Sequence, residues 1–179
     1  MIITISGEAG SGKSTCARGL ASEFHLKHYS VGDLMRLLAL EKNIKLEEMS
    51  KIAEESSEID KELDNRQIQL GKKEDNFIID GRMSAYFIPQ AIKIFLTADL
   101  EERAKRIYMA KRSLEPSSSV EEAKSKIIRR KESEIKRYMS WYDFNPYDPG
   151  VYDIVYDSTG KSVETMIHEI GHGISNLKN

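Results

Sequence analysis

Short apolar runs alternate with longer amphipathic stretches along this chain of 179 residues. Each run has the length of a buried strand, and the runs occupy residues 2–5, 26–30, 76–80, 92–96 and 152–156. Helical patterns separate them, and the first of these covers residues 14–24. Strands that alternate with helices predict an α/β fold of three layers, in which helices cover both faces of a five-stranded parallel sheet.

Two segments carry many charges and little apolar periodicity. We expect residues 33–73 and 108–136 to be insertions that cover a site rather than parts of the core. In the second segment a proline and three serines interrupt the pattern, and Ser119 with Glu122 forms a capping box that predicts a new helix. A helix, a break and a second helix are typical of a mobile lid. Residues 1–179 are therefore predicted to form one domain with two insertions.

The most informative motif lies between the first strand and the first helix. Residues 7–14 have the sequence GEAGSGKS, which fits the phosphate-binding loop G-x-x-x-x-G-K-[ST] in its usual context. The glycines let backbone N–H groups converge on phosphate oxygens, the lysine adds a positive charge, and the last serine is a magnesium ligand. The predicted donor-binding residues are Gly7, Glu8, Ala9, Gly10, Ser11, Gly12, Lys13, Ser14 and Thr15.

A carboxylate ends the third strand. Residues 76–80 have the sequence NFIID, and an acid at the end of a strand beside a phosphate-binding loop is the usual partner of the nucleotide's magnesium. Asp80, acting through water, and Ser14 are therefore the candidate metal ligands. The alternative for Asp80 is an ordinary turn residue at a strand end.

Arginines accumulate where the insertions lie, at Arg36, Arg82, Arg103, Arg106, Arg112, Arg130 and Arg137. Arg130, Glu134 and Arg137 recur at helical spacing, so they share one helix face on which Glu134 can hold the guanidinium groups. Planar guanidinium groups match phosphate oxygens. The alternative is a solvated charged helix, which we accept for the neighbouring lysines Lys105, Lys124 and Lys136.

The arginines favour an acceptor that is itself a phosphate. A hydroxyl acceptor benefits from a catalytic base, whereas a phosphate monoester, with a second pKa of about 6, is already ionised at neutral pH. Such an acceptor needs cations that cancel the repulsion between two anionic groups. Arginines and magnesium supply those cations.

The composition limits which partners and which cell compartment we expect. The formal net charge of −2 shows no basic excess for nucleic acid and no polybasic tail for a membrane, and the apolar runs are too short to span a bilayer. The start of the chain lacks the pattern of a signal peptide. The one cysteine, Cys16, excludes an internal disulfide and is most simply a small core residue. We expect a cytoplasmic monomer.

Several segments together resemble the nucleoside monophosphate kinases, and among them the archaeal-type cytidylate kinases. Residues 30–36 resemble the S-x-G-D-x-x-R segment of that family, and residues 58–67 resemble the acidic helix E-I-D-x-x-[LI]-D-x-R-Q of the archaeal group. Residues 79–82, 130–138 and 152–158 resemble its strand-end G-R, its lid-exit helix and its last strand. The resemblance covers nearly the whole chain.

The resemblance implies transfer of a phosphoryl group from Mg-ATP to CMP and dCMP. Arg36, Arg82, Arg130 and Arg137 would hold the acceptor and the transferred phosphate, and Asp33 would cap the helix after it. Arg103 and Arg106 would approach the donor phosphates, and residues 158–161, including Ser158, would lie near the donor base. Candidates for contact with the acceptor are Asp60, Asp64, Arg66, Gln67 and Gly81. The alternative for the charged members of this set is an ion network on a helix surface.

Three positions depart from the pattern. Glu8 and Ala9 stand where many relatives have two prolines, and we expect little effect because these positions contribute backbone. Ala85 stands where the group often has glycine, so it is expected to narrow the acceptor site. Val31 replaces the threonine that adenylate kinases place near adenine, which disfavours AMP.

Other functions are weighed against this one. A kinase for UMP, AMP or a nucleoside is the alternative within the class, and a nucleoside acceptor would take Asp33 as its base. A non-catalytic nucleotide-binding module is the alternative outside it.

Residues 168–172 also match the zinc motif H-E-x-x-H. His168 and His172 lie off the apolar stripe of their helix, and too few residues follow for a third ligand, so we do not expect a catalytic zinc site.

Overall fold

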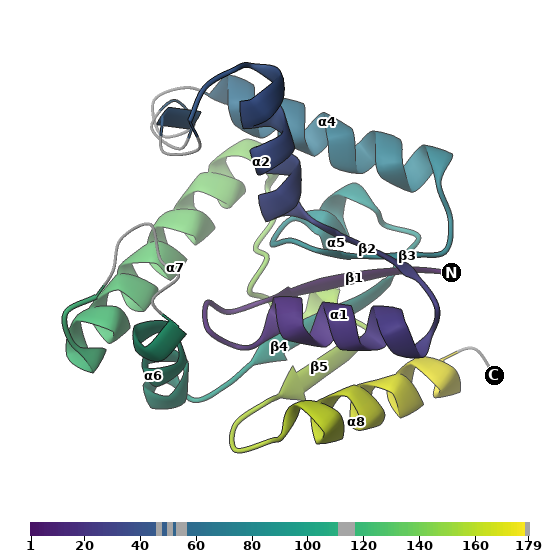
Figure 1. Cartoon of the computed structure of the whole chain (residues 1–179), viewed down its shortest axis with the longest axis vertical. Helices are drawn as coiled ribbons and strands as arrows, with labels where there is room; N and C mark the ends of the chain where they lie inside the picture. Colours follow the sequence, from purple (N-terminus) through teal and green to yellow (C-terminus); the bar gives the residue numbers. More distant parts are fainter. Residues whose placement is uncertain (46–47, 50–51, 53–56, 111–116, 178–179) are drawn as a thin grey trace.

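The computed structural model describes residues 1–45, 48–49, 52, 57–110 and 117–177 (Figure 1). Among these residues five parallel strands form one sheet in the order β2-β3-β1-β4-β5. The strands are β1 (Ile2–Gly7), β2 (Lys27–Ser30), β3 (Phe77–Asp80), β4 (Ile92–Thr97) and β5 (Ile154–Asp157). The predicted sheet is therefore confirmed. The last strand begins two residues late, because Tyr152 still belongs to the end of a 3₁₀ turn, η1 (Pro149–Val151).

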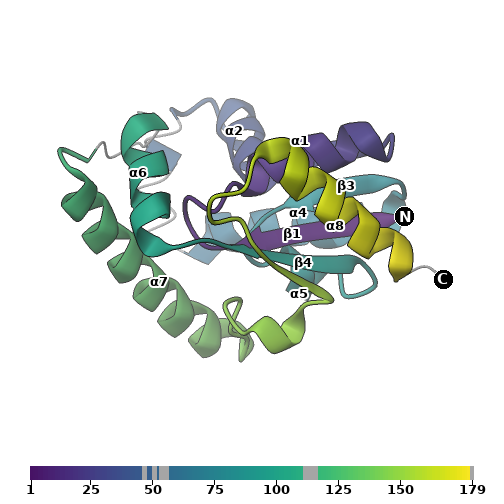
Figure 2. The same ribbon diagram turned by 90° about the horizontal axis from the view of Figure 1, so that it is seen from below.

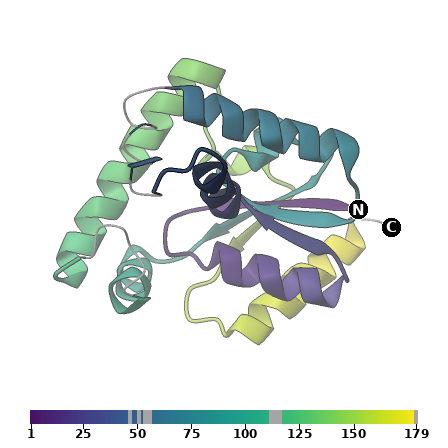
Figure 3. The ribbon, with the colours of Figure 1, turned by 45° about the horizontal axis from the view of Figure 1, so that its top comes forward.

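Helices surround the sheet on both faces. They are α1 (Lys13–Glu23), α2 (Val31–Glu41), α4 (Ser57–Lys73), α5 (Ser84–Phe87), α6 (Leu100–Ala110), α7 (Val120–Tyr142) and α8 (Val163–Asn176). Helices α1 and α8 cover one face, and α4 and α5 lie over the other (Figure 3). Helices α6 and α7 stand beyond the carboxyl end of the sheet, on the same side as the loop that follows β1 (Figure 2).

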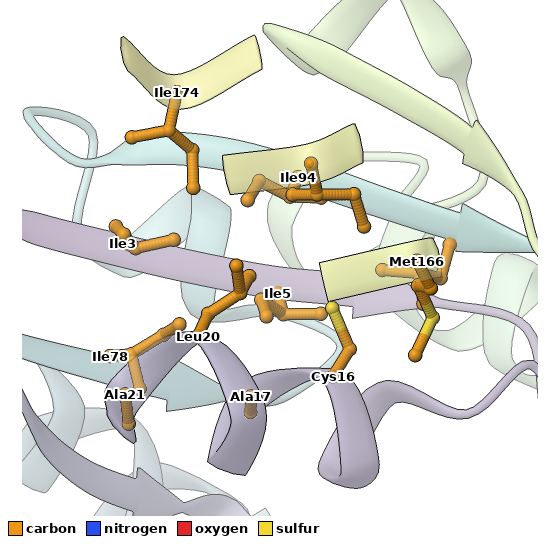
Figure 4. Packing of buried hydrophobic residues seen from close by; sticks show 12 residues of the cluster. Ile3, Ile5, Cys16, Ala17, Leu20, Ala21, Ile78, Ile94, Met166 and Ile174 are labelled. Atoms are coloured by element: carbon orange, nitrogen blue, oxygen red, sulfur yellow. The ribbon is translucent and has the colours of Figure 1, made fainter. Parts of the chain in front are cut away.

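Both faces of the central strands are buried, which explains their continuous apolar character. On one face Ile3 and Ile5 of β1 pack with Leu20 of α1 and Ile170 and Ile174 of α8, all with almost no exposed surface (Figure 4). Cys16 belongs to this cluster, and burial raises the pKa of its thiol to about 12. The predicted structural role of this cysteine is confirmed.

The segment between α2 and α4 has an apolar cluster of its own. Its buried members are Leu38, Ala39, Met49, Ile59 and Leu63. Leu34 contacts both this cluster and the one that lies between β3, α4 and α5. The two helices therefore pack on each other, and Leu34 connects them to the sheet.

Side-chain caps set the starts of α7 and α2. Ser119 accepts a hydrogen bond of 3.1 Å from the N–H of Glu122, so the predicted start of α7 is confirmed. Ser30 caps α2 by accepting from the N–H of Asp33 at 3.1 Å. The capping role predicted for Asp33 is therefore wrong: Asp33 lies in the first turn, where its charge suits the helix dipole.

No described helix is both long enough and apolar enough to cross a bilayer.

Candidate active site

The phosphate-binding loop connects β1, the central strand, to the amino end of α1. Gly7 has φ 143°, and a Cβ on it would lie 2.1 Å from the carbonyl oxygen of Leu96, so β4 passes too close for any side chain. Gly12 caps α1 in the left-handed conformation with φ 92°. Ser11 Oγ and Lys13 Nζ both donate to the Glu8 carbonyl, at 2.9 and 2.8 Å. The loop is thus closed around its own backbone and presents the amino end of α1 to a cavity.

That cavity has a volume of about 700 Å³ and spans both halves of the predicted site. Residues 10–15 of the loop line its floor, and Asp33 and Arg36 line it from α2. Lys161, Val163 and Met166 line the opposite end, next to Arg18 of α1. A phosphate chain on the loop would therefore have room for a nucleoside at one end and a second anion at the other.

The candidate metal ligands lie together. Ser14 Oγ donates to Asp80 Oδ2 at 2.7 Å, and the other carboxylate oxygen of Asp80 lies 2.8 Å from Nε2 of His28. Ser14 and Asp80 fit a magnesium ion that also takes phosphate oxygens and water. No cluster of three His, Cys, Asp or Glu side chains able to hold a metal occurs among the described residues, so the nucleotide would have to complete the coordination. His28 was not predicted. Its signal is a polar residue on the strand that pairs with β3.

Arg106 closes the donor side of the cavity. Its guanidinium donates to the carbonyl and to the hydroxyl of Ser158, both at 3.0 Å, and it pairs with Glu102 one turn earlier. Ser158 also donates to the carbonyl of Ser11 at 2.9 Å, which ties the loop after β5 to the phosphate-binding loop. Both residues line the cavity, where donor contact was predicted for them.

Arg103 lies behind the loop instead. Its side chain is buried, donates to the carbonyl of Ala98 at 2.7 Å and lies 3.2 Å from the carboxylate of Glu8. The donor contact predicted for it has no geometric support, because the guanidinium faces the underside of the loop. Arg112 lies outside the described residues.

Lys13 is held in an environment that disfavours its charge. Burial lowers the pKa of its amino group to about 7, and the positive charges of Arg82 and Arg130 act in the same direction. The carboxylates of Asp80 and Glu134 oppose the shift but do not cancel it. Cations from three separate elements therefore converge here, and an anionic ligand would relieve their repulsion.

Glu134 of α7 is the centre of the arginine cluster. It is buried, it pairs with Arg82 from the end of β3, and its other oxygen accepts from Arg130 Nε at 2.8 Å. Tyr147 donates to the same carboxylate at 2.5 Å. Burial raises the pKa of Glu134, but Arg82, Arg130 and Tyr147 outweigh it and hold the pKa below its usual value. The predicted role of Glu134 as an arginine holder fits this geometry for Arg130. Arg82 and Tyr147 are further partners.

Arg137 faces α4 rather than Glu134. Its guanidinium lies 3.8 Å from Asp60 Oδ2 and over the rings of Tyr138 and Trp141, at 4.9 and 5.6 Å from their centroids. Asp60 Oδ2 and Arg137 Nε are both buried without a hydrogen-bond partner. Burial raises the pKa of Asp60 despite the nearby arginine. Asp60 Oδ2 therefore has an ion pair with Arg137 but no hydrogen bond, so it has the capacity to accept one from a ligand.

Asp64 lies one turn further along α4. Burial raises its pKa to about 6, although the hydroxyl of Tyr142 donates to it. Asp64 borders a second cavity of about 470 Å³, which Phe87 and Trp141 also line. Gln67 is fully buried and accepts from Ser84 Oγ at 2.8 Å.

Arg66 and Gly81 make contacts other than the predicted ones with the acceptor. Arg66 pairs with Glu41 and Glu62 on the outer surface of α2 and α4, so the alternative of a surface ion network describes it. Gly81 is needed for packing, because a Cβ on it would lie 2.3 Å from the side chain of Val31. Contacts of these two residues with the acceptor stay predictions without support from this geometry.

Two of the departures from the family pattern also differ from expectation. Ala85 packs in the core with Phe95 and Tyr152, so its methyl group does not narrow the acceptor site. The Glu8 side chain is buried and makes contacts of its own: its carboxylate accepts hydrogen bonds from Thr97 Oγ1 and from Lys131 Nζ, both at 2.7 Å. Its carboxylate therefore links the phosphate-binding loop to β4 and α7.

The H-E-x-x-H motif lies on α8, where His168 and His172 are both exposed. Nδ1 of His172 lies 3.2 Å from the side-chain amide of Asn176. Neither histidine takes part in a three-residue metal cluster among the described residues.

Comparisons with known proteins identify the family of the chain. A cytidylate kinase from Methanosphaera stadtmanae is 37% identical over 178 residues, which cover 99% of this chain and 100% of that protein. A cytidylate kinase from Thermococcus kodakarensis is 41% identical over 159 residues, which cover 88% and 79% of the two chains. A shikimate kinase structure from Aquifex aeolicus matches with a TM-score of 0.65 at 18% identity, covering 99% of this chain and 98% of that one, and shows the shared fold. Residues 2–160 match the Cytidylate kinase-like family, and the chain belongs to that family.

Proposed function

We propose that this protein transfers the γ-phosphoryl group of ATP to CMP and dCMP, giving ADP and the corresponding diphosphate. The observation that carries the proposal is the convergence of Lys13, Arg82 and Arg130 at the carboxyl end of the sheet, beside a cavity with room for two nucleotides' phosphates. Its relatives with 36–41% identity are cytidylate kinases.

On this proposal the loop and Lys13 bind the donor's β and γ phosphates, and Arg106 neutralises them from the side of α6. Ser14 and Asp80 would hold Mg²⁺, which supplies charge neutralisation and orientation of the phosphates. Arg36, Arg82 and Arg137 hold the acceptor phosphate, and Arg130 faces the transferred group. An oxygen of the acceptor phosphate forms the new bond to the γ phosphorus as the bond to the ADP oxygen breaks. No proton leaves the acceptor, so no base is required.

The unpartnered oxygen of Asp60 supports a preference for cytosine. A carboxylate oxygen buried without a donor suits a base that carries an amino group, and cytosine has one where uracil has a carbonyl. The carbonyl of uracil would meet the carboxylate as a second acceptor and be repelled. Residues 33–73 would then form the acceptor-binding insertion, and residues 108–136 the lid that excludes water during transfer.

A coupled assay of ADP formation tests the proposal with CMP, dCMP, UMP, AMP and GMP as acceptors. We expect turnover with CMP and dCMP and a loss of several orders of magnitude in Lys13→Ala. Tight ATP binding without transfer to any monophosphate would instead indicate a binding module. Preference for UMP over CMP would contradict the assignment of Asp60, because uracil has no amino group to donate.

A further inference from the structure

The Glu8 side chain points away from the nucleotide cavity. Only 7% of the residue's surface is exposed, and its carboxylate contacts α6 and α7, which lie on either side of residues 111–119 in the sequence and which we call the lid helices: Lys131 Nζ of α7 at 2.7 Å and Arg103 Nη2 of α6 at 3.2 Å. Thr97 at the end of β4 donates the third contact at 2.7 Å. Burial raises the pKa of Glu8, but the hydrogen bonds from Lys131 and Thr97 and the positive charges of Arg103 and Lys131 outweigh it and hold the pKa below its usual value.

Ala9 makes a second and independent contact with the same helices. It packs against the apolar cluster of Ala104, Ala123 and Ile127, which joins α6 to α7. Two adjacent loop residues therefore contact the lid helices, one through charge and one through apolar surface.

Lys131 continues the chain of contacts toward the arginine cluster. Its amino group lies 5.1 Å from the centroid of the Tyr147 ring, within cation–π range. The hydroxyl of Tyr147 donates to Glu134, which holds Arg82 and Arg130. Lys131 and Glu134 are three residues apart, so they lie on the same face of α7. A displacement of this turn of α7 away from the loop would carry Glu134 and Arg130 with it and would separate Glu134 from Arg82, which follows β3.

We propose that Glu8 and Lys131 are positioning residues for phosphoryl transfer: their ion pair sets the position of α7 relative to the phosphate-binding loop, so that the arginines held by Glu134 meet the phosphates that the loop binds. Neither side chain touches the reacting atoms. The inference rests on the proposed kinase activity and assigns a role to a loop side chain that the nucleotide itself does not require. Loss of the pair lowers kcat by misplacing the arginines and leaves ATP binding to the loop backbone.

The variant Lys131→Met tests the proposal, and Lys124→Met is its matched control. Both lysines are on α7 and pair with a glutamate, but Lys124 pairs with Glu101 on the surface, away from the loop. We expect Lys131→Met to lower kcat about tenfold, with less than about a twofold change in the KM for ATP, and Lys124→Met to change neither by more than about twofold. Equal effects in the two variants, or a kcat near that of the wild type in Lys131→Met, would overturn the proposal.

Trp141 provides a readout that does not depend on activity. It is the one tryptophan of the chain and stands near the end of α7. If the pair positions α7, acrylamide quenching of Trp141 in the nucleotide-free protein changes in Lys131→Met and stays as in the wild type in Lys124→Met. Unchanged quenching in both variants contradicts the proposal. This comparison holds even if the wild type fails to phosphorylate CMP, an outcome that would refute the proposed function alone.

A double-mutant cycle with Glu8→Gln identifies the partner. If the two residues act through one contact, the kcat of the double variant equals that of the single variant with the lower kcat. If the losses of the two single variants multiply, the residues act separately. Glu8→Gln leaves Arg103 without its buried partner, so its melting temperature is measured first. If it does not fold, the Lys131 and Lys124 comparison decides the question, because the Lys131 side chain is 41% exposed and its substitution is expected to leave the fold intact.

Discussion

Nucleotide binding should bring a proton to Lys13. In the free protein burial and the charges of Arg82 and Arg130 lower its pKa to about 7, so a large part of the population is neutral above that pH. A triphosphate placed on the loop reverses the balance, because its negative charges favour the ammonium form and cancel the repulsion from the arginines. Above about pH 7 the ATP complex therefore holds a proton that most of the free protein lacks.

The number of protons follows from the pKa. At about pH 8 a group with a pKa of about 7 is about one-tenth protonated, so full protonation in the complex takes up about 0.9 proton per ATP bound. At about pH 6 the amino group is already about nine-tenths protonated, and only about 0.1 proton is taken up. Uptake should thus rise steeply through neutral pH.

Isothermal titration calorimetry in two buffers of different ionisation enthalpy measures this uptake directly. ATP is titrated without an acceptor, and Lys13→Met serves as the control, since any proton change on ATP itself is common to both proteins. The difference between wild type and variant is the contribution of Lys13. No difference at about pH 8, with binding intact, would refute the claim that the free site depresses the lysine's pKa.

Three further outcomes are expected. Because folding lowers the pKa of Lys13 from 10.5 to about 7, the unfolded chain binds more protons between those values, and the lysine's contribution to stability rises with pH across that window. Lys13→Met should therefore raise the melting temperature of the nucleotide-free protein below about pH 7 while abolishing transfer. An unchanged or lower melting temperature there would contradict a pKa of Lys13 that falls on folding. Glu134→Gln should lower kcat by about a hundredfold, because Arg82 and Arg130 lose their anchor, whereas Glu132→Gln on the exposed side of α7 should stay within about twofold; initial rates with saturating ATP measure both. Asp60→Asn should raise the KM for CMP and narrow the preference for CMP over UMP with little change in the KM for ATP; an unchanged ratio of kcat/KM for CMP and UMP would remove Asp60 from base recognition.

Sequence reasoning located the parts of the site that follow from local pattern. The strand, the glycine loop and the helix lie next to each other in the chain, and the spacing of Arg130 and Glu134 alone places them on one helix face. Asp80 was found because it ends an apolar run beside the central strand. Each of these predictions needed only short-range geometry or the general order of a parallel sheet.

The contacts that were missed join residues far apart in the sequence. Glu8 and Lys131 are 123 positions apart, and Tyr147 meets Arg82 across 65 positions. Nothing in periodicity or motif spacing says that a glutamate in the loop will turn toward the lid helices. The same limit explains why Arg137 was assigned to the Glu134 group: helical spacing allows that contact, but the side chain turns toward Asp60 of α4.

The small apolar cluster between α2 and α4 has an evolutionary consequence. Its members pack mainly on one another, and Leu34 is the side chain that it shares with the cluster against the sheet. Substitutions at the members of this cluster other than Leu34 thus disturb a local unit, while the central strands that carry the nucleotide loop keep their packing. Substitutions that change the preference for the acceptor can therefore accumulate at these positions while the strands that position the ATP-binding loop stay folded.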